Sequence, residues 1–187
     1  MLKTKVLSSF KSKIIYRSKI DEGICKEASE YAKTNKDKFL EKSWECKIKT
    51  SFNLTNNILN VVNLHRLKMN ILSHIDNFMN QNNSFYDGYL KTSWINIYEK
   101  DFYQEYHIHN NTVDNFISGV VYLSENNSNI VLASKEDLVD IIKHTPSFGD
   151  IILFFGDTPH MVEPNTNDSL RISLAFNFKL VEKWSKP

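Results

Sequence analysis

The chain has 187 residues, of which 41% are hydrophobic and 24% are charged, which is typical of one folded domain. Lys and Arg number 23 against 22 Asp and Glu, so the net charge of +1 excludes the broad basic surface of a dedicated nucleic-acid binder. Cys25 and Cys46 are too few for a disulfide scaffold and form no CxxC pair, so we expect reduced thiols in a cytoplasmic protein. The longest apolar run, Ile151 to Phe155, is far too short to cross a bilayer.

Residues 1–90 are predicted to form a helical layer with one or two strands. The Lys-rich start is better explained as an opening strand that includes Val6 and Tyr16 than as a targeting segment. Asp21 is expected to cap a helix that ends near Asn35, and a strand is expected over residues 44–52. A long amphipathic helix is predicted next, because apolar residues recur at steps of three and four. Its apolar face comprises Ile58, Val61, Leu64, Leu67, Ile71, Ile75 and Phe78.

Residues 91–180 change to a period of two, which is typical of short β-strands. The predicted strands are Thr92 to Tyr98, Tyr106 to His109, Phe116 to Leu123, Ile130 to Ala133, Asp150 to Phe155, His160 to Val162 and Leu170 to Phe178. Turn residues separate these strands, as in a sandwich or barrel. The sequence therefore predicts one domain, residues 1–187, of the α+β class but mainly β, with helices packed against a β core. A homodimer is left open.

His107 and His109 are separated by Ile108, so on a strand both imidazoles project from the same face. Two nitrogen ligands at this spacing can occupy adjacent positions around one metal ion. Taken alone, the pair fits a solvent-facing pair of polar residues better.

His160 changes this balance, because it follows a distant apolar strand that ends in a turn. Two ligands from one strand and a third from another hold a metal on one side and leave the other side open. Arg171 and Ser173 follow on one face of the next strand, where an arginine and a hydroxyl can bind a carboxylate. A surface salt bridge would explain Arg171 equally well on its own.

This order of residues resembles the Fe(II)/2-oxoglutarate-dependent dioxygenases, in particular the prolyl-hydroxylase-like branch. The resemblance covers about Trp94 to Phe178 and includes Val121-Tyr-Leu123 and the strand before His160. It implies a double-stranded β-helix, or jelly-roll, core of the cupin-like kind. It also implies that Fe(II), 2-oxoglutarate and O2 are used to oxidise a substrate, with release of succinate and CO2.

The resemblance implies particular roles for the residues of the pattern. His107, His109 and His160 would be the iron ligands and so the catalytic centre. Arg171 and Ser173 would hold the distal carboxylate of 2-oxoglutarate, with Tyr122 as a third partner. Tyr98 and Asn96, on the preceding strand, would line the same cavity.

One position departs from the family pattern, because His109 stands where the family has an Asp or Glu. A three-imidazole site would leave Fe(II) its full double charge and strengthen its attraction to dianionic 2-oxoglutarate. The alternative carboxylate ligands are Glu105, on the same strand, and Asp157, close to His160. The remaining histidines are expected to be structural or solvated; they are His65, His74 and His144.

Two other functions remain open on the sequence. One is a three-histidine cupin-like metalloenzyme that does not use 2-oxoglutarate, which would leave Arg171 unexplained. The other is a non-catalytic jelly-roll binding module. Nucleic-acid repair is disfavoured, because relatives with that activity carry a second arginine where this chain has Asn177. The substrate is expected to be a protein residue or a small molecule, with hydroxylation as the reaction.

Overall fold

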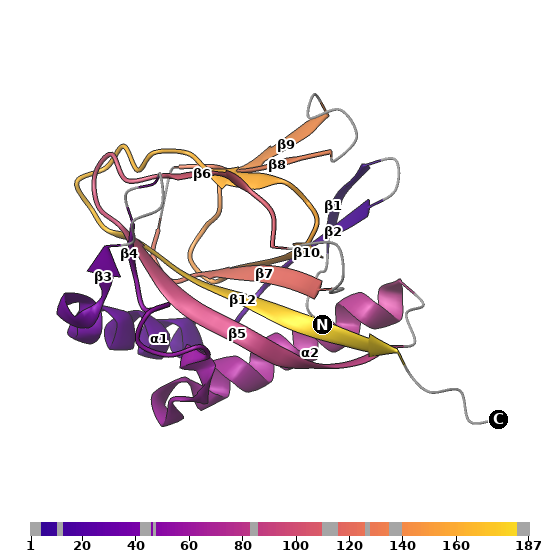
Figure 1. The fold of residues 1–187 in the computed structure, drawn as a ribbon, viewed down its shortest axis with the longest axis horizontal. Helices are drawn as coiled ribbons and strands as arrows, with labels where there is room; N and C mark the ends of the chain where they lie inside the picture. The colour runs from indigo at the N-terminus through magenta and orange to yellow at the C-terminus, as the bar shows by residue number, and fades with distance from the viewer. Residues whose placement is uncertain are drawn as a thin grey trace.

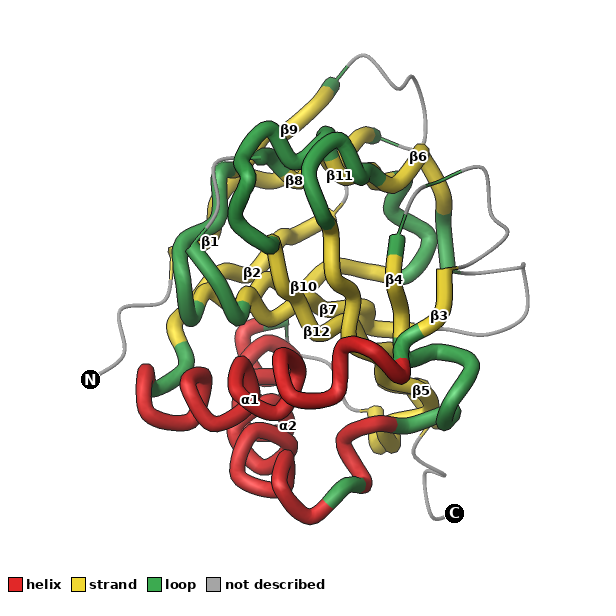
Figure 2. Tube along the Cα trace, turned by 90° about the vertical axis from the view of Figure 1, so that its left-hand side faces the viewer, coloured by secondary structure: helices red, strands yellow, loops and turns green. Residues whose placement is uncertain are grey.

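Two antiparallel β-sheets pack face to face, and two helices cover the outer face of the larger sheet (Figures 1 and 2). The architecture is that of a computed structural model of the chain. It describes residues 5–10, 13–41, 46, 48–82, 86–109, 116–125, 128–134 and 140–182.

The main sheet contains eight strands in the order β1-β2-β10-β7-β12-β5-β4-β3. Its long central pair, β12 and β5, stays in antiparallel register from Arg171↔Tyr98 to Glu182↔Tyr86. The strands in sheet order are β1 (Lys5–Phe10), β2 (Lys13–Lys19), β10 (Asp150–Phe155), β7 (Phe116–Tyr122), β12 (Arg171–Glu182), β5 (Tyr86–Tyr98), β4 (Lys49–Thr50) and β3 (Leu40–Glu41).

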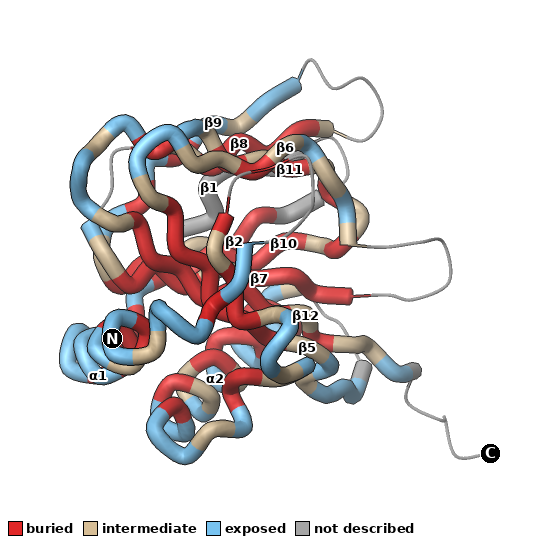
Figure 3. Tube along the Cα trace, turned by 60° about the vertical axis from the view of Figure 1, so that its left-hand side comes forward, coloured by how far each residue is buried: buried red, intermediate tan, exposed pale blue. Residues whose placement is uncertain are grey.

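The minor sheet contains four strands in the order β6-β11-β8-β9. Their bounds are β6 (Gln104–His107), β11 (His160–Val162), β8 (Ile130–Ala133) and β9 (Ile141–His144). Inward-facing apolar side chains of the two sheets meet in a buried cluster, which is how alternating strands bury one face each. This arrangement is the predicted mainly β jelly roll, with buried residues gathered between the sheets and beneath the helices (Figure 3).

The helices are α1 (Glu22–Asn35) and α2 (His65–Gln81). The carboxylate of Asp21 accepts hydrogen bonds from the N–H groups of Gly23 and Ile24 and so caps α1, as predicted. The apolar face of α2, which includes Leu67 and Ile71, is buried in the largest core cluster together with residues of the main sheet. The predicted helical layer therefore supports the β core from behind.

The amphipathic helix starts later than its periodicity predicts. Two 3-10 turns, Ile58–Asn60 and Val62–Leu64, precede α2, and Val61 between them has an extended backbone. The N–H of Leu59 donates to the hydroxyl of Ser93 on β5 at 3.0 Å. This hydrogen bond to the main sheet explains why the residues before α2 do not continue the α-helix.

Most of the predicted strands are confirmed. β8, β10 and β11 have the predicted bounds, and the opening strand is present as β1 and β2. Of the strand predicted over residues 44–52, only Lys49–Thr50 is a strand, and residues 42–45 and 47 lie outside the described residues. Strand β9 was not predicted. Gly149, with φ of 81°, forms the turn before β10, in a conformation that glycine adopts without strain.

Several residues outside the jelly-roll cavity have structural partners. The hydroxyl of Tyr16 lies 2.8 Å from Nδ1 of His74, and Nε2 of His144 lies 3.2 Å from the carboxylate of Asp150. Cys25 and Cys46 are buried thiols. Neither described helix has the length and apolar character needed to span a membrane.

Candidate metal centre and carboxylate pocket

The three histidines of the predicted metal site converge between the two sheets. His107 ends β6 and His160 begins β11, and the two residues are direct partners in the antiparallel pairing. His109 lies just beyond β6, with its Nε2 3.2 Å from Nε2 of His107. The ligand nitrogens of all three lie within 4.8 Å of one another. Nitrogens bound about 2.1 Å from one ion at a right angle would be about 3 Å apart, so the observed spacing fits a shared metal ion.

The protonation of His107 and His160 is set by backbone carbonyls. Nδ1 of His107 lies 2.9 Å from the carbonyl oxygen of Glu105, and Nδ1 of His160 lies 2.9 Å from that of Thr158. A carbonyl oxygen can only accept, so each Nδ1 must donate its hydrogen. Each Nε2 is then left with a lone pair that points into the cluster.

His109 is oriented by side chains instead. Its Nδ1 lies 2.7 Å from Oδ1 of Asn177 and 2.9 Å from the hydroxyl of Ser118, which itself donates to the same Asn177 oxygen. The amide nitrogen of Asn177 donates to Thr92, which fixes the orientation of the amide. Asn177 therefore accepts from His109, and Nε2 of His109 is also available to a metal.

Burial keeps the three imidazoles neutral. Removal from water lowers the pKa of His107, and it lowers the pKa of His109 to about 4, with the neighbouring His107 adding to the effect. The pKa of His160 is also lowered, first by burial and then by the other two rings. Neutral imidazoles at neutral pH are the form that binds a metal ion.

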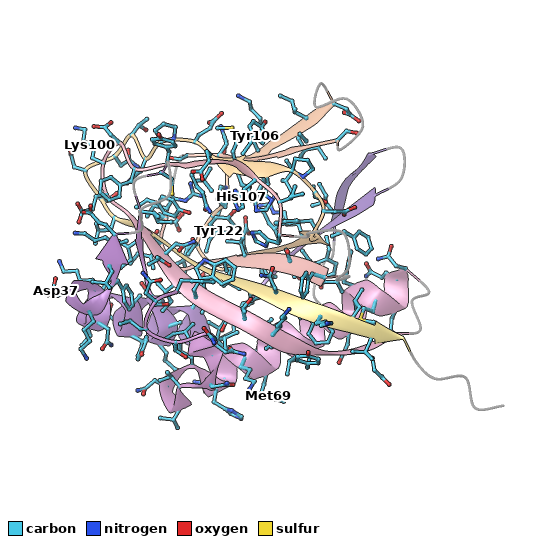
Figure 4. The ribbon with its side chains drawn as sticks, in the orientation of Figure 1. Asp37, Met69, Lys100, Tyr106, His107 and Tyr122 are labelled. Atoms are coloured by element: carbon cyan, nitrogen blue, oxygen red, sulfur yellow. The ribbon has the colours of Figure 1, made fainter. Side chains whose placement is uncertain are left out.

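A narrow cavity leads from the histidines to the residues predicted to bind a carboxylate. Strand register brings these residues together, because Arg171 on β12 pairs with Tyr98 on β5, and Ser173 pairs with both Asn96 and Tyr122. All five line the cavity together with the three histidines. Figure 4 shows His107 and Tyr122 between the two sheets.

Arg171 is a buried cation, and part of its donor capacity is unused within the described residues. Its side chain is 1% exposed, and within the described residues its Nε and Nη1 have no hydrogen-bond partner. The guanidinium lies over the rings of Tyr98 and Tyr122, at 5.0 and 5.6 Å from their centroids. A surface salt bridge is therefore not its role. A buried cation with open donors requires an anionic acceptor, and a planar carboxylate fits a guanidinium.

The tyrosines add neutral donors to this pocket. Burial raises the pKa of Tyr98, and it raises the pKa of Tyr122 to about 12, so both hydroxyls keep their protons. Tyr98 donates to Oε1 of Gln104 at 3.0 Å. The hydroxyl of Tyr122 lies beside the guanidinium of Arg171, which counters part of the rise in its pKa, and the hydrogen of this hydroxyl is left to donate to a bound group.

Gln104 and Asn177 are site residues whose roles were not predicted. Nε2 of Gln104 lies 3.3 Å from Nε2 of His107, although strict alternation from His107 would turn Gln104 away. A register shift between β6 and β11 explains this, because Gln104 pairs with Val162 while His107 pairs with His160. The hydrogen bond that Asn177 accepts from His109 depends on a contact between distant strands, so the sequence carries no direct signal for it.

The alternative carboxylate ligands lie outside the convergent cluster. Among the described residues, the group that could hold an ion consists of His107, His109 and His160 and includes neither Glu105 nor Asp157. This geometry supports the three-imidazole arrangement.

No family model matches the chain, and no curated protein matches it in sequence. Solved structures do match in fold. A prolyl-4-hydroxylase from Pseudomonas putida has a TM-score of 0.69 at 12% identity, over 88% of this chain and 91% of that chain. A Trichoplax adhaerens prolyl hydroxylase, solved with a hypoxia-inducible-factor peptide fragment, has a TM-score of 0.63 at 15% identity, over 87% and 83%. SnoN, a non-haem α-ketoglutarate-dependent epimerase of nogalamycin biosynthesis, has a TM-score of 0.67 at 12% identity, over 88% and 76%. The chain therefore has the double-stranded β-helix fold found in 2-oxoglutarate oxygenases.

Proposed function

We propose that the protein is an Fe(II)- and 2-oxoglutarate-dependent oxygenase. One observation carries this proposal: a single buried cavity contains both three convergent imidazole nitrogens and the uncompensated guanidinium of Arg171. The first feature suits a divalent metal, and the second suits a carboxylate. A co-substrate that chelates a metal at one end and carries a carboxylate at the other would satisfy both.

The residues present fit these two groups. Nε2 of His107, His109 and His160 would hold the ion, and Arg171 with Tyr122 and Ser173 would hold the distal carboxylate of 2-oxoglutarate. Tyr98 and Asn96 would line the space between. When bound, iron and 2-oxoglutarate supply the oxidising chemistry with O2, and succinate and CO2 are released.

The chain contributes orientation and shielding. The hydrogen bonds at each Nδ1 fix the imidazole planes, so His107, His109 and His160 would present three neutral ligands to the ion. Because none of the three residues is a carboxylate, a divalent ion held by them would keep its double positive charge and would attract a dianion more strongly. The apolar cluster between the sheets, which includes Ile130 and Phe154, limits water around the site.

Hydroxylation of a protein residue or of a small molecule is the reaction that we favour, in a cytoplasmic setting. Structural neighbours include two prolyl hydroxylases and an epimerase of nogalamycin biosynthesis, so the fold admits more than one outcome. Nucleic-acid repair is disfavoured by the position of Asn177. Its side chain is engaged in holding His109, so it is not free to contact a co-substrate or a phosphate.

The two alternatives account for fewer of the observations. A cupin-like enzyme without 2-oxoglutarate, or a non-catalytic binding module, would leave the donors of Arg171 buried without an acceptor. An oxygen electrode with parallel succinate detection separates the three functions. We expect oxygen uptake and succinate in equal amounts only when Fe(II) and 2-oxoglutarate are both present. Oxygen uptake without succinate would favour the cupin-like enzyme, and no uptake with any metal would favour the binding module.

A further inference from the structure

A second, wider cavity is lined by two of the histidines and does not include Arg171 in its lining. Its volume is about 340 Å³. It shares Trp94, Gln104, His107 and His109 with the narrow cavity, so a molecule in it would reach the metal position. Its further walls are Phe52, Glu105, Ile108 and Asn177. We call it the outer pocket.

Glu105 places a carboxylate on the wall of the outer pocket. Its Oε2 is buried, and no described residue donates a hydrogen bond to it. The backbone carbonyl of the same residue accepts from His107, which holds this part of β6 in place. A carboxylate oxygen that is shielded from water and unpaired favours a cationic or strongly donating partner.

Aromatic rings form another wall of the same pocket. Phe52 and Trp94 pack edge to face, with centroids 5.3 Å apart and planes at 84°. Trp94 in turn lies 5.8 Å from the ring of His109, which fixes its position beside the metal site. Aromatic faces attract ammonium and guanidinium groups, and most strongly where water is excluded.

The remaining lining does not oppose a cation. Among the described residues, the outer pocket has no lysine or arginine, and Gln104 and Asn177 are neutral amides. The positive charge of Arg171 lies in the narrow cavity, where 2-oxoglutarate would neutralise it. The second negative charge of 2-oxoglutarate would offset half of the metal ion's double charge, and the carboxylate of Glu105, on the wall of the outer pocket, would offset the rest.

We propose that the outer pocket binds the cationic group of the substrate, an ammonium or guanidinium, between the Glu105 carboxylate and the Phe52–Trp94 wall. This places carbon atoms next to the cation within reach of the metal. The inference rests on the proposed function, because the bound cation is a substrate group only if the protein is an oxygenase. The cation could belong to a lysine or arginine residue of a protein or to a free amine such as a polyamine.

Isothermal titration calorimetry tests the proposal on the full chain, both metal-free and loaded with Zn(II) and 2-oxoglutarate. The probes are spermidine, Nα-acetyl-L-lysine amide and a short N-acetylated lysine peptide amide, and the controls are the norleucine analogues of the last two, which carry no ammonium group. We expect the cationic member of a pair to bind about ten- to a hundredfold more tightly. A preference confined to the peptide pair would identify a protein residue as the source, and a preference confined to the free amines would identify a small molecule.

Substitutions of Glu105 test whether its carboxylate causes the preference for cationic probes. Glu105→Gln is expected to remove the cation preference, whereas Glu105→Asp, which keeps the charge, should retain part of it. Glu30→Gln is the matched control, because Glu30 is an exposed residue of α1 that pairs with Lys33 at 3.0 Å. It should leave the preference unchanged.

Three results would overturn the inference: equal binding of charged and neutral probes, a preference that survives in Glu105→Gln, or a loss of metal affinity in that variant. The last result would make Glu105 a metal ligand. Metal and 2-oxoglutarate binding are titrated separately, so the two proposals fail in different ways. Cation binding without 2-oxoglutarate binding would contradict the proposed function alone, and the reverse would contradict this inference alone.

Discussion

His107 and His160 face each other across the β6–β11 pair, with ring centroids 4.1 Å apart. Strand register, rather than closeness in the sequence, joins these two imidazoles. A slip of one residue would turn His160 to the opposite face of its strand. The three-histidine cluster is therefore a product of the pairing between β6 and β11.

The contribution of His109 can be measured with two substitutions. His109→Ala should weaken metal binding by more than the about 10–100-fold that is typical of losing an outer hydrogen-bond partner. His109→Asp introduces the carboxylate of the common family pattern and should retain the metal. It should bind 2-oxoglutarate less tightly, because the charge of the metal face falls. Metal titration of both variants provides the comparison, and full metal affinity in His109→Ala would make this residue a bystander.

Asn177 is predicted to act on the metal through His109. Asn177→Ala removes the acceptor at 2.7 Å from Nδ1 and should lower metal affinity about 10–100-fold. Asn177→Asp keeps an oxygen in this position and should recover most of that loss. Competition with a chelator measures both variants. Recovery by Asn177→Leu, which has no acceptor, would mean that only packing matters here.

The support that α2 gives to the sheet can be tested at Leu67, which is 1% exposed. Leu67→Ala should lower the free energy of unfolding by about 2–5 kcal/mol, since a cavity is left in the core. Met69 on the same helix is 52% exposed and provides the control. Met69→Ala should change stability by less than about 0.5 kcal/mol in urea titrations. Equal effects would place Leu67 outside the core.

Acid sensitivity is predicted from Asp150, a fully buried carboxylate with Arg17 at 2.9 Å and Lys19 at 3.0 Å. Burial alone would raise its pKa, but the hydrogen bond with His144, the N–H of Ser147 and the two cations outweigh it and lower the pKa to about 2. Between this value and the unfolded pKa of about 3.9, the unfolded chain binds more protons. Stability should therefore fall as the pH drops through this window. Asp150→Asn should lower stability at neutral pH and flatten the decline, and an unchanged decline would assign it to other carboxylates.

Local patterns predicted a large part of the fold. The alternation of apolar residues located β8, β10 and β11, and Asp21 identified the start of α1, because strand alternation and helix capping depend on near neighbours. His107, His160 and Arg171 stand on strands whose facing residues can be counted, whereas His109 lies just beyond the end of β6.

Features that depend on distant contacts were not predictable. The 3-10 turns before α2 exist because Leu59 bonds to Ser93, and Gln104 enters the site because the register of β6 shifts. The outer pocket needs Phe52, from a turn, to meet Trp94 on β5. None of these contacts leaves a periodic signal in the sequence.

The binding of 2-oxoglutarate, measured by calorimetry with and without metal, tests the central claim most directly. In the presence of Zn(II) or anaerobic Fe(II), we predict one molecule bound per chain, and much weaker binding without metal. Arg171→Ala should weaken the metal-dependent binding by one to two orders of magnitude, because an unpaired charged hydrogen-bonding group costs about 1.5–3 kcal/mol, while metal affinity stays the same. Binding of 2-oxoglutarate that is independent of both the metal and Arg171, or no binding at all, would contradict the account.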